Sequence, residues 1–575
     1  MATPLNPYGK MSEADQERLV SRRNTRKRVF VISLSSIVLV AVVVAAVVGA
    51  TSHAKGDKSD GKDSMSSALK VVCDATLYPE SCYSSMSPLV KSNNVSPQDF
   101  PKLAVQVAIN QLSKATDDFF QNDAVKNVKD NMTILALESC QELLSLAFDH
   151  LNDSLAVTDK SILEAFDDLG TWLSSAGTYQ ETCIDGLLES NNATSSPLST
   201  IASEVLRLPS EYTSNSLAIV SSIQNSVDSV DAMGAIGKRR LLMDETPAWL
   251  SFNERKLLQA PRSQIKFDAV VAKDGSGKYK RIKDALKAVP EKSDKRFVIY
   301  VKKGVYNEHV TIEKTQWNVM IVGDGMDATV VTGSLNFIDG TPTFQTATFA
   351  VKGKGFIARD MKFVNSAGAA KHQAVAMMST ADLSVFYRCK MDAFQDTLYP
   401  HSNRQFYREC TILGTVDFIF GNSAVVLQNC NILPRKPMPG QQTTITAQGK
   451  IDPNQNTGIV IHNCVIKPYG DLSDVNNFLG RPWKNHSTTV FMKNNMAGFI
   501  HPNGWLPWIG NDAPPTIFYA EFQNTGPGAV TKNRVKWRGL RLDLNANQAN
   551  KFTVQNFISG HKWLSRAGVV FKAGL

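Results

Sequence analysis

The sequence predicts two folded units of different class: an all-α helical bundle, followed by an all-β, right-handed parallel β-helix. In the front part of the chain, apolar residues recur at helical spacing, and in the back part short β-branched runs alternate with Gly, Asn and Asp turns. A motif in the back part also repeats at close to twenty residues, which is typical of stacked coils that bury one shared core. At 575 residues the chain exceeds a single compact domain.

The chain begins with a basic segment and an uncharged, apolar run at residues 29–50. The run is long enough to span a bilayer, and basic residues stay on the cytosolic side. We therefore expect a cytoplasmic tail at residues 1–28, a transmembrane signal anchor at 29–50 and a polar linker at 51–65. A cleaved signal peptide is the alternative, although this apolar run is longer than a usual signal core.

Residues 66–225 are predicted to form the helical bundle. One apolar stripe per helix indicates helices that bury these stripes together as a plain core, with no cofactor between them. The stripes consist of Leu137, Cys140, Leu144, Ala147, Leu151 and Leu155, and of Ile162, Phe166, Leu169, Leu173 and Ala176.

Residues 226–261 break the helical pattern and contain two basic pairs, Arg239 with Arg240 and Arg255 with Lys256. Each pair is followed by two leucines. Extended, exposed linkers of this kind are cut by processing proteases, so we expect cleavage here. A merely solvated basic linker is the alternative.

The two halves of the chain carry opposite charge. Residues 259–575 contain 39 Lys and Arg against 22 Asp and Glu, and the remaining residues contain 23 against 31. We expect the acidic front and the basic back to attract each other. The basic part would also suit a polyanion, such as an acidic polysaccharide, a nucleic acid or a membrane surface.

Eight cysteines form two sets, and no C-x-x-C pair is present, which argues against a zinc ribbon or a redox motif. In an oxidising lumen the front set can form two bridges. The front set is Cys73, Cys82, Cys140 and Cys183, and the back set is Cys389, Cys410, Cys430 and Cys464.

Glycosylation is expected at five Asn-x-Ser/Thr sequons: Asn94, Asn131, Asn152, Asn192 and Asn485.

The back set of cysteines marks the repeat of the solenoid. Aligned on cysteine, four similar segments are separated by 21, 20 and 34 residues. Cysteines at equivalent positions on successive coils are expected to stack inside as small apolar side chains. Cys410 and Cys430 would also be close enough to form a disulfide.

Two aspartates share this spacing. Asp396 and Asp417 are 21 residues apart, which places them on adjacent coils at about the strand spacing of 5 Å. Two close carboxyls in apolar surroundings do not both ionise, so one becomes a nucleophile and the other a general acid. Gln373 precedes Gln395 by 22 residues, and two stacked amides suit a developing oxyanion.

Three further residues fit the same site. Arg481 is expected to orient one aspartate and keep it ionised, while Tyr399 and Trp483 offer flat apolar faces for sugar rings. The nine histidines lack metal-ligand spacing, so no metal site and no cofactor are predicted.

The back half, from residue 262 to 575, resembles the pectin methylesterase family. The resemblance is carried by five motifs in order: Gly304-Val305-Tyr306-Asn307-Glu308, Gln373-Ala374-Val375-Ala376, Gln395-Asp396-Thr397-Leu398-Tyr399, Gly414-Thr415-Val416-Asp417-Phe418-Ile419-Phe420-Gly421-Asn422 and Leu479-Gly480-Arg481-Pro482-Trp483. The front half resembles the pectin methylesterase inhibitor family, which implies a four-helix bundle with bridges Cys73–Cys82 and Cys140–Cys183.

The resemblance implies an enzyme that hydrolyses methyl esters of homogalacturonan and releases methanol. It implies Asp417 as the nucleophile, Asp396 as the proton donor and Arg481 as the residue that holds Asp417. It further implies that Gln373 and Gln395 stabilise the oxyanion. The implied substrate contacts, with Tyr399 added from its aromatic face, are Thr343, Gln373, Tyr399, Arg481 and Trp483.

The same resemblance implies a plant precursor whose bundle is autoinhibitory. The expected partners are pectin, a processing protease, a separate inhibitor protein and the membrane, but no nucleic acid. The precursor is expected in the Golgi membrane and the mature enzyme in the cell wall.

Two other functions remain open from the residues. Pectate lyases and polygalacturonases are also built as β-helices, so the fold alone does not decide between them. A calcium-binding acid cluster is not evident, and Arg281-Ile282-Lys283 lacks the clustered aspartates of a polygalacturonase. In the non-enzymatic alternative, the bundle is an inhibitor or chaperone and the β-helix only binds pectin.

Overall fold

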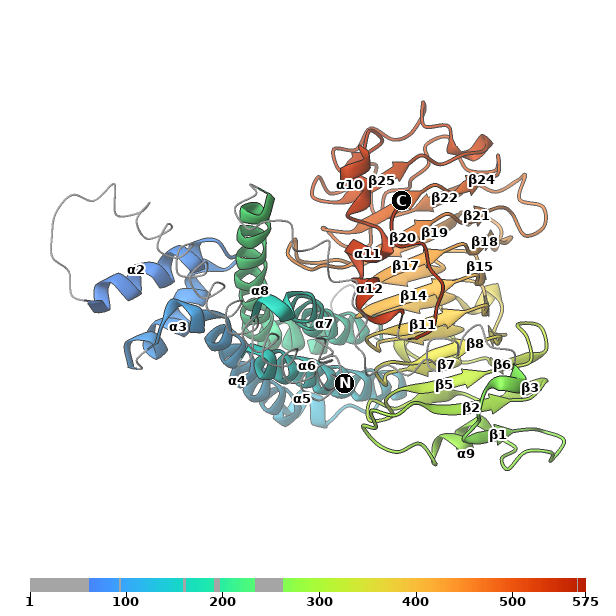
Figure 1. The fold of residues 1–575 in the computed structure, drawn as a ribbon, viewed down its shortest axis with the longest axis horizontal. Coiled ribbons are helices and arrows are strands. Elements are labelled where there is room, and N and C mark those ends of the chain that lie inside the picture. The colour runs from blue at the N-terminus through green and yellow to red at the C-terminus, as the bar shows by residue number, and fades with distance from the viewer. Residues whose placement is uncertain (1–60, 93–94, 159–161, 191–196, 233–261, 566) are drawn as a thin grey trace, which may run out of the picture.

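The computed structural model describes residues 61–92, 95–158, 162–190, 197–232, 262–565 and 567–575. Two units pack against each other, a group of helices and a solenoid of β-strands (Figure 1). Helix α2 begins at Gly61, inside the predicted linker, and α8 continues to Ala232, beyond the predicted end of the bundle.

Several predictions fall outside the described residues. These are the cytoplasmic tail, the membrane anchor at 29–50, both basic pairs (Arg239, Arg240, Arg255, Lys256) and two sequons (Asn94, Asn192). Within the parts of the chain that the structure describes, none of the helices combines the length and the apolar character that a membrane span requires.

The helices of the front unit form a bundle as predicted. Cys140, Leu144, Ala147 and Leu151 of the first stripe are buried, and they pack against a buried stripe that includes Leu169. Four long helices, α4, α6, α7 and α8, share this core. The helices are α2 (Gly61–Asp74), α3 (Pro79–Ser92), α4 (Phe100–Gln121), α5 (Asp123–Lys126), α6 (Asn131–Thr158), α7 (Ile162–Glu189) and α8 (Pro197–Ala232).

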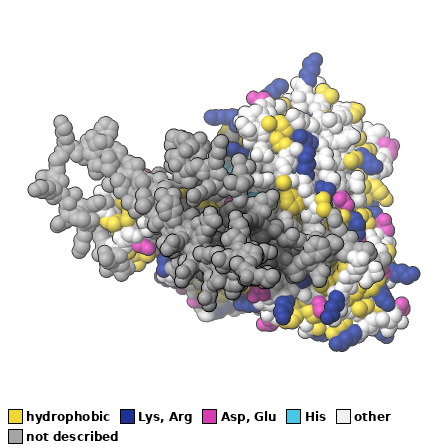
Figure 2. All heavy atoms as spheres, in the orientation of Figure 1, with side chains coloured by type: hydrophobic (Ala, Val, Ile, Leu, Met, Phe, Trp, Pro, Cys, Tyr) yellow, Lys and Arg dark blue, Asp and Glu magenta, His cyan; other side chains and the backbone are white. Residues whose placement is uncertain are grey.

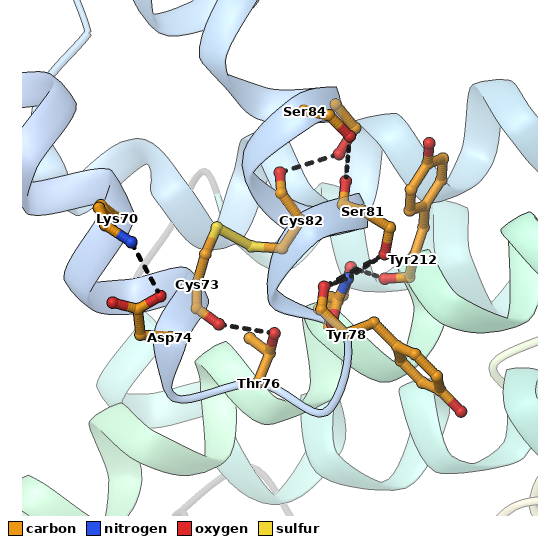
Figure 3. The surroundings of a disulfide bond; sticks show 12 residues. Lys70, Cys73, Asp74, Thr76, Tyr78, Ser81, Cys82, Ser84 and Tyr212 are labelled. Atoms are coloured by element: carbon orange, nitrogen blue, oxygen red, sulfur yellow. Dashed lines mark hydrogen bonds and ion pairs between the residues drawn. A yellow bond between two sulfur atoms is a disulfide. The ribbon is translucent and has the colours of Figure 1, made fainter.

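Both disulfides expected in the bundle are present. Cys140–Cys183 joins α6 to α7 inside the core, and Cys73–Cys82 joins α2 to α3. Figure 3 shows the second bridge beside the short turn between these helices, where the Thr76 hydroxyl donates to the Cys73 carbonyl at 2.8 Å. The bridge therefore closes a hairpin of two short helices.

The back unit is a parallel β-helix of three sheets, which confirms the predicted class of fold. Each described strand pairs in parallel with a strand about one coil away, so the strands stack along the solenoid (Figure 1). An apolar core runs inside the coils.

The eleven-stranded sheet contains β1 (Ala269–Val271), β2 (Phe297–Val301), β5 (Val319–Val322), β8 (Ile357–Arg359), β11 (Ser384–Tyr387), β14 (Arg404–Arg408), β17 (Ala424–Gln428), β20 (Gly458–His462), β23 (Thr488–Met492), β25 (Phe518–Phe522) and β26 (Leu540–Arg541). The eight-stranded sheet contains β3 (Gly304–Asn307), β6 (Thr329–Gly333), β9 (Lys362–Asn365), β12 (Lys390–Asp392), β15 (Thr411–Gly414), β18 (Asn431–Pro434), β21 (Val465–Ile466) and β24 (Asn495–Met496). The third, seven-stranded sheet, called the cleft sheet below, contains β4 (Val310–Ile312), β7 (Phe349–Val351), β10 (Met377–Ser379), β13 (Leu398–Pro400), β16 (Ile419–Gly421), β19 (Thr443–Gln448) and β22 (Asn477–Gly480).

The cysteine-aligned repeat corresponds to one sharp corner of each coil. The residue before each of the four cysteines has a left-handed backbone, with φ between 50° and 56°. These corner residues are Arg388, Glu409, Asn429 and Asn463. At each corner one residue with a left-handed backbone turns the chain. The side chain of the cysteine that follows then points into the core.

The cysteines after these corners lie in the core as predicted, and each is at most 1% exposed. The predicted disulfide between Cys410 and Cys430 is wrong, because both are free thiols. The Cys410 Sγ lies 3.3 Å from the Phe386 carbonyl, and the Cys430 Sγ lies 3.6 Å from the Tyr407 carbonyl. Each thiol therefore has a backbone acceptor on the neighbouring coil and is not part of a disulfide.

Candidate active site

The two aspartates of the predicted pair lie on adjacent coils of the cleft sheet. Asp396 precedes β13 and Asp417 precedes β16, and these strands pair through Leu398 and Ile419. The Asp396 N–H donates to the Val416 carbonyl at 3.1 Å, which fixes the two turns side by side. Both aspartates have left-handed backbones, with φ of 61° and 50°. Strained residues of this kind persist only where the surrounding structure holds them, and they gather at functional sites.

Asp417 is held in place by hydrogen bonds from Arg481 and Thr444. The Arg481 Nε donates to its Oδ1 at 2.9 Å and the Nη2 donates to its Oδ2 at 2.6 Å, so the pair is bidentate. Thr444 adds a third contact, because its hydroxyl donates to Asp417 Oδ1 at 2.5 Å. Charge-assisted bonds of this kind fix the position of the Asp417 carboxylate, which lines the chamber described below.

Asp396 lies in surroundings that disfavour its charged form. Burial raises its pKa well above the usual value, and the nearby charge of Asp417 raises it further. Asp396 is 7% exposed and Asp417 is 5% exposed, so neither is shielded by bulk water. The raised pKa favours the protonated form of Asp396, as a proton donor requires.

The two glutamines lie beside this pair on consecutive coils, because the Ala374 N–H donates to the Gln395 carbonyl at 3.3 Å. The Gln373 Oε1 is buried and has no hydrogen-bond partner among the described residues. This oxygen can therefore accept a hydrogen bond from a bound ligand.

These residues surround a chamber of about 370 Å³ between the β-helix and the bundle. All of the predicted catalytic and substrate-binding residues line it: Thr343, Gln373, Gln395, Asp396, Tyr399, Asp417, Arg481 and Trp483. One expectation needs a correction, because Tyr399 is only 3% exposed and one face of its ring stacks on Phe420 at 4.1 Å. Tyr399 therefore contributes to the wall and does not present an open face.

Sequence reasoning missed Trp508, Phe420 and Thr444 as members of the site. The Arg481 guanidinium lies 4.3 Å from the centre of the Trp508 ring, so the arginine is held between this ring and Asp417. Trp508 lies outside the strands and outside any repeat, which left no signal in the sequence. Phe420 belongs to the sequence motif that contains Asp417. Only its ring contact with Tyr399 shows that it forms part of the chamber wall.

Helix α7 closes the chamber from the bundle side. Glu189 accepts hydrogen bonds from the N–H and the hydroxyl of Thr343, and Asp185 also lines the chamber. Burial raises the pKa of Glu189 to about 7 and that of Asp185 to about 6, although Lys484 opposes the second shift.

The predicted attraction between the acidic and basic halves appears as ion pairs across the interface. Each joins a basic residue of the β-helix to an acidic residue of the bundle. The pairs are Lys314–Asp149, Lys352–Glu142, Lys484–Glu181, Lys484–Asp185, Arg404–Asp168 and Lys562–Asp167. Figure 2 shows further Lys and Arg side chains spread over the visible face of the β-helix.

The residues that would indicate a polygalacturonase are not among those that line the chamber. Arg281, Ile282 and Lys283 lie at the start of helix α9 (Ile282–Leu286), where Glu308 accepts from the N–H groups of Ile282 and Lys283. Among the described residues, no group of three or more His, Cys, Asp or Glu is placed to hold a metal ion.

Both units of the chain are similar to known proteins. The model of the family described as Pectinesterase matches residues 268–561, and that of Plant invertase/pectin methylesterase inhibitor matches residues 67–219. "Probable pectinesterase/pectinesterase inhibitor 46" of Arabidopsis thaliana is 52% identical over 99% of this chain and 100% of its own length. "Pectinesterase 3" of Phaseolus vulgaris is 48% identical over 99% of this chain and 98% of its own length.

One solved structure resembles the β-helix closely. The pectin methylesterase from carrot is 51% identical and superposes with a TM-score of 0.54. The similarity covers 54% of this chain and 99% of the carrot chain. The carrot structure therefore corresponds to about half of the present chain.

Proposed function

This chain belongs to the pectinesterase family as a plant precursor with an inhibitor-like domain, and we propose that it demethylates pectin with Asp417 as the nucleophile. The carboxylate of Asp417 attacks the carbonyl carbon of a galacturonate methyl ester. Gln373 and Gln395 donate their amide hydrogens to the oxyanion that forms. Arg481 holds the attacking carboxylate in place throughout.

Collapse of this intermediate breaks the bond to the methoxy group. Asp396 gives its proton to the departing oxygen, so methanol leaves and an anhydride joins Asp417 to the sugar. Asp396, now ionised, takes a proton from water, and the resulting hydroxide opens the anhydride. The net reaction consumes one water and yields methanol, a free galacturonate and one proton that passes to solvent, with both aspartates restored.

The environment of the two aspartates is the observation that carries this proposal. Asp417 receives two bonds from Arg481 and one from Thr444, whereas burial raises the pKa of Asp396. Neither a Ser–His pair nor a metal ion is required for this chemistry.

Substitution of the nucleophile tests the proposal. In enzyme cleaved from its bundle, we expect Asp417→Asn to lower methanol release from esterified pectin by at least about 1000-fold. The control is Asp327→Asn, which changes an exposed aspartate on the eight-stranded face, where it pairs with Lys390. Substantial methanol release by Asp417→Asn would contradict the proposal, and unsaturated or new reducing ends would instead favour a lyase or a polygalacturonase.

We further propose that the bundle inhibits the enzyme until it is cleaved away. Helix α7 contributes Asp185 and Glu189 to the wall of the chamber that Asp417 also lines. A polysaccharide would have to displace this helix to reach Asp417. The six ion pairs described above support a closed precursor.

Cleavage of the intact precursor tests this inhibition. We expect little activity on pectin before the segment 233–261 is cut and full activity after the bundle is separated from the β-helix. Equal rates before and after separation would remove the inhibitory role. The N-terminus of the mature protein would identify which basic pair, Arg239–Arg240 or Arg255–Lys256, is cut.

We also propose the predicted route through the secretory pathway, with a Golgi membrane precursor and a mature enzyme in the cell wall. The sequons at Asn131, Asn152 and Asn485 have exposed side chains, which supports glycosylation. Glycosidase treatment of the precursor should increase its gel mobility. Recovery of the intact, unglycosylated chain from cytosol would contradict this route.

A further inference from the structure

Six lysines lie together at the end of the β-helix where the solenoid begins. They occupy the segments that follow β1 and β2, and Figure 1 places both strands and α9 at this end. The two segments run side by side, because the Lys302 N–H donates to the Val271 carbonyl at 2.9 Å. The Lys273 Nζ also donates to the Val305 carbonyl at 2.6 Å. The six residues, called the lysine patch below, are Lys273, Lys278, Lys280, Lys283, Lys302 and Lys303.

The positive charge of the lysine patch is only partly balanced. Segments 272–284 and 302–308 contain seven Lys and Arg against three Asp and Glu. The ammonium groups of Lys273 and Lys302 bond to neutral acceptors, which are the Val305 carbonyl and the Ser276 hydroxyl. The other four side chains of the patch are exposed. These contacts therefore fix the position of two ammonium groups without neutralising them.

The acids near the patch are engaged by other groups. They are Asp274, Asp284, Glu308 and, on the second coil, Asp324. Asp274, Glu308 and Asp324 each accept a hydrogen bond from a backbone N–H. Asp284 pairs with Lys287 at 3.2 Å. Even with Asp324 included, seven basic residues face four acids, so this end of the solenoid presents an excess of positive charge.

The lysine patch is separate from the catalytic chamber. None of its residues lines the chamber. The ion pairs that join the β-helix to the bundle use Lys314, Lys352, Arg404, Lys484 and Lys562 instead. Five of the six lysines are exposed while the bundle is docked. The patch is therefore accessible in the precursor and in the cleaved enzyme alike.

A group of lysines held close together suits a linear polyanion. A single exposed ion pair is weak, but several pairs along one polymer reinforce one another, because each contact raises the effective concentration of the next. Demethylated homogalacturonan carries a carboxylate on every unit, and the proposed reaction produces it. Val305 is 55% exposed beside the Lys273 ammonium group and offers an apolar contact for a sugar ring. A fully esterified polymer offers the patch no charge.

We propose that the lysine patch is a second polymer-binding site, which binds demethylated homogalacturonan away from the catalytic chamber and retains the protein on it. This inference rests on the proposed function, which supplies the acidic polymer. Because the bundle leaves the patch exposed, the precursor binds this polymer although α7 closes its chamber. Binding at the patch and demethylation at the chamber are then separable properties of the chain.

The test measures binding of the full chain to beads that carry polygalacturonate, with fully methyl-esterified pectin as the neutral reference. Four exposed lysines of the patch are neutralised together, as Lys278→Gln, Lys280→Gln, Lys283→Gln and Lys303→Gln. We expect the Kd for polygalacturonate to rise about thirtyfold, or roughly two- to threefold for each lost ion pair. Binding should also depend less steeply on salt, since fewer ion pairs form. Methanol release from a short methyl-esterified oligogalacturonate by the cleaved enzyme should not change.

The matched control removes the same charge from the opposite end of the solenoid. It changes four exposed basic residues, as Lys532→Gln, Lys536→Gln, Arg538→Gln and Lys551→Gln. We expect at most a threefold rise in Kd for this variant. An equal loss in both variants would attribute binding to overall charge and would overturn the inference.

Three further outcomes are decisive. Unchanged binding in the patch variant would overturn the inference, as would binding by the cleaved enzyme and not by the full chain, because the polymer would then lie in the catalytic cleft. A larger loss of binding to phosphatidylserine vesicles than to polygalacturonate would assign the patch to a membrane surface and would also overturn it. Failure of the cleaved wild type to release methanol would instead refute the proposed function, which the binding measurement does not address.

Discussion

Glu189, the last residue of α7, accepts hydrogen bonds from both the backbone N–H and the hydroxyl of Thr343. This contact joins the end of a bundle helix to the wall of the chamber that contains Asp396 and Asp417. A carboxyl group of the inhibitor-like unit is thus buried in the site of an enzyme that produces carboxylates. Its protonation links the docking of the bundle to pH.

Docking of the bundle is predicted to weaken as pH rises. The pKa of Glu189 is about 7 in the docked state, mainly because burial disfavours its charge, and 4.5 is the ordinary value. The docked state therefore holds a proton that the released state gives up, so docking is strongest below pH 4.5 and loses this contribution as pH rises through 7. Asp185, with a pKa of about 6, acts in the same direction. We expect the affinity of the cleaved bundle for the β-helix to fall on the order of tenfold between pH 5 and 7.5.

Calorimetric titration at several pH values measures this affinity. Glu189→Gln is the informative variant, because it keeps the shape and one acceptor oxygen but cannot ionise. Its affinity should change less steeply with pH than that of the wild type. The same slope in both proteins would show that other groups set the pH dependence.

The bidentate contact between Arg481 and Asp417 yields a second prediction. Lysine keeps the charge but presents a single ammonium group, so it does not reproduce the two-bond geometry. We expect Arg481→Lys to lower kcat on esterified pectin by about 100-fold, as for other groups that position a reacting atom. A thermal midpoint near that of the wild type would show that the loss is one of geometry and not of folding. Retention of most of kcat would contradict the role given to Arg481.

The coil spacing made much of this site predictable. In a parallel solenoid, residues one repeat apart lie side by side, so the separation of Asp396 and Asp417 alone placed them on adjacent coils. The apolar stripes predicted the bundle for a similar reason, since burial follows the helical period. Opposite net charges predicted an attraction between the units, although not which residues would meet.

Other residues of the site are brought together by contacts that do not follow the coil repeat. Thr444 lies 27 residues beyond Asp417, because the coil between them is longer than the repeat. Trp508 comes from a segment without strands, and Glu189 comes from the other unit. The disulfide between Cys410 and Cys430 was wrong because closeness on adjacent coils does not determine whether two thiols pair or bond to carbonyls.

The four cysteines of the β-helix are predicted to react as free thiols once the chain is unfolded. Alkylation in denaturant without a reducing agent should label Cys389, Cys410, Cys430 and Cys464 and leave the bundle cysteines unlabelled. In the folded protein their burial should prevent labelling. Mass spectrometry of the peptides measures both states, and a linked peptide pair containing Cys410 and Cys430 would contradict the prediction.

The two bundle disulfides are predicted to stabilise the bundle to different extents. Cys140–Cys183 spans 43 residues and Cys73–Cys82 spans 9. Loop entropy then assigns about 4 kcal/mol to the first and about 2.6 kcal/mol to the second. Replacing each pair with two serines and measuring denaturant unfolding of the precursor by far-ultraviolet circular dichroism should show the larger loss for Cys140 and Cys183. Equal losses would show that strain or residual structure outweighs loop length.

Gln373 offers a test of transition-state stabilisation. Its side chain lines the chamber together with Asp396 and Asp417. Removal of one oxyanion donor lowers kcat by about 100-fold in comparable sites, and we expect this effect for Gln373→Leu with little change in KM. Gln405 serves as the contrast, because its amide bonds the Ser379 and Ser402 carbonyls and its loss should lower stability instead. If Gln373→Leu raised KM and left kcat unchanged, the glutamine would bind the substrate's ground state, and the oxyanion would depend on Gln395 alone.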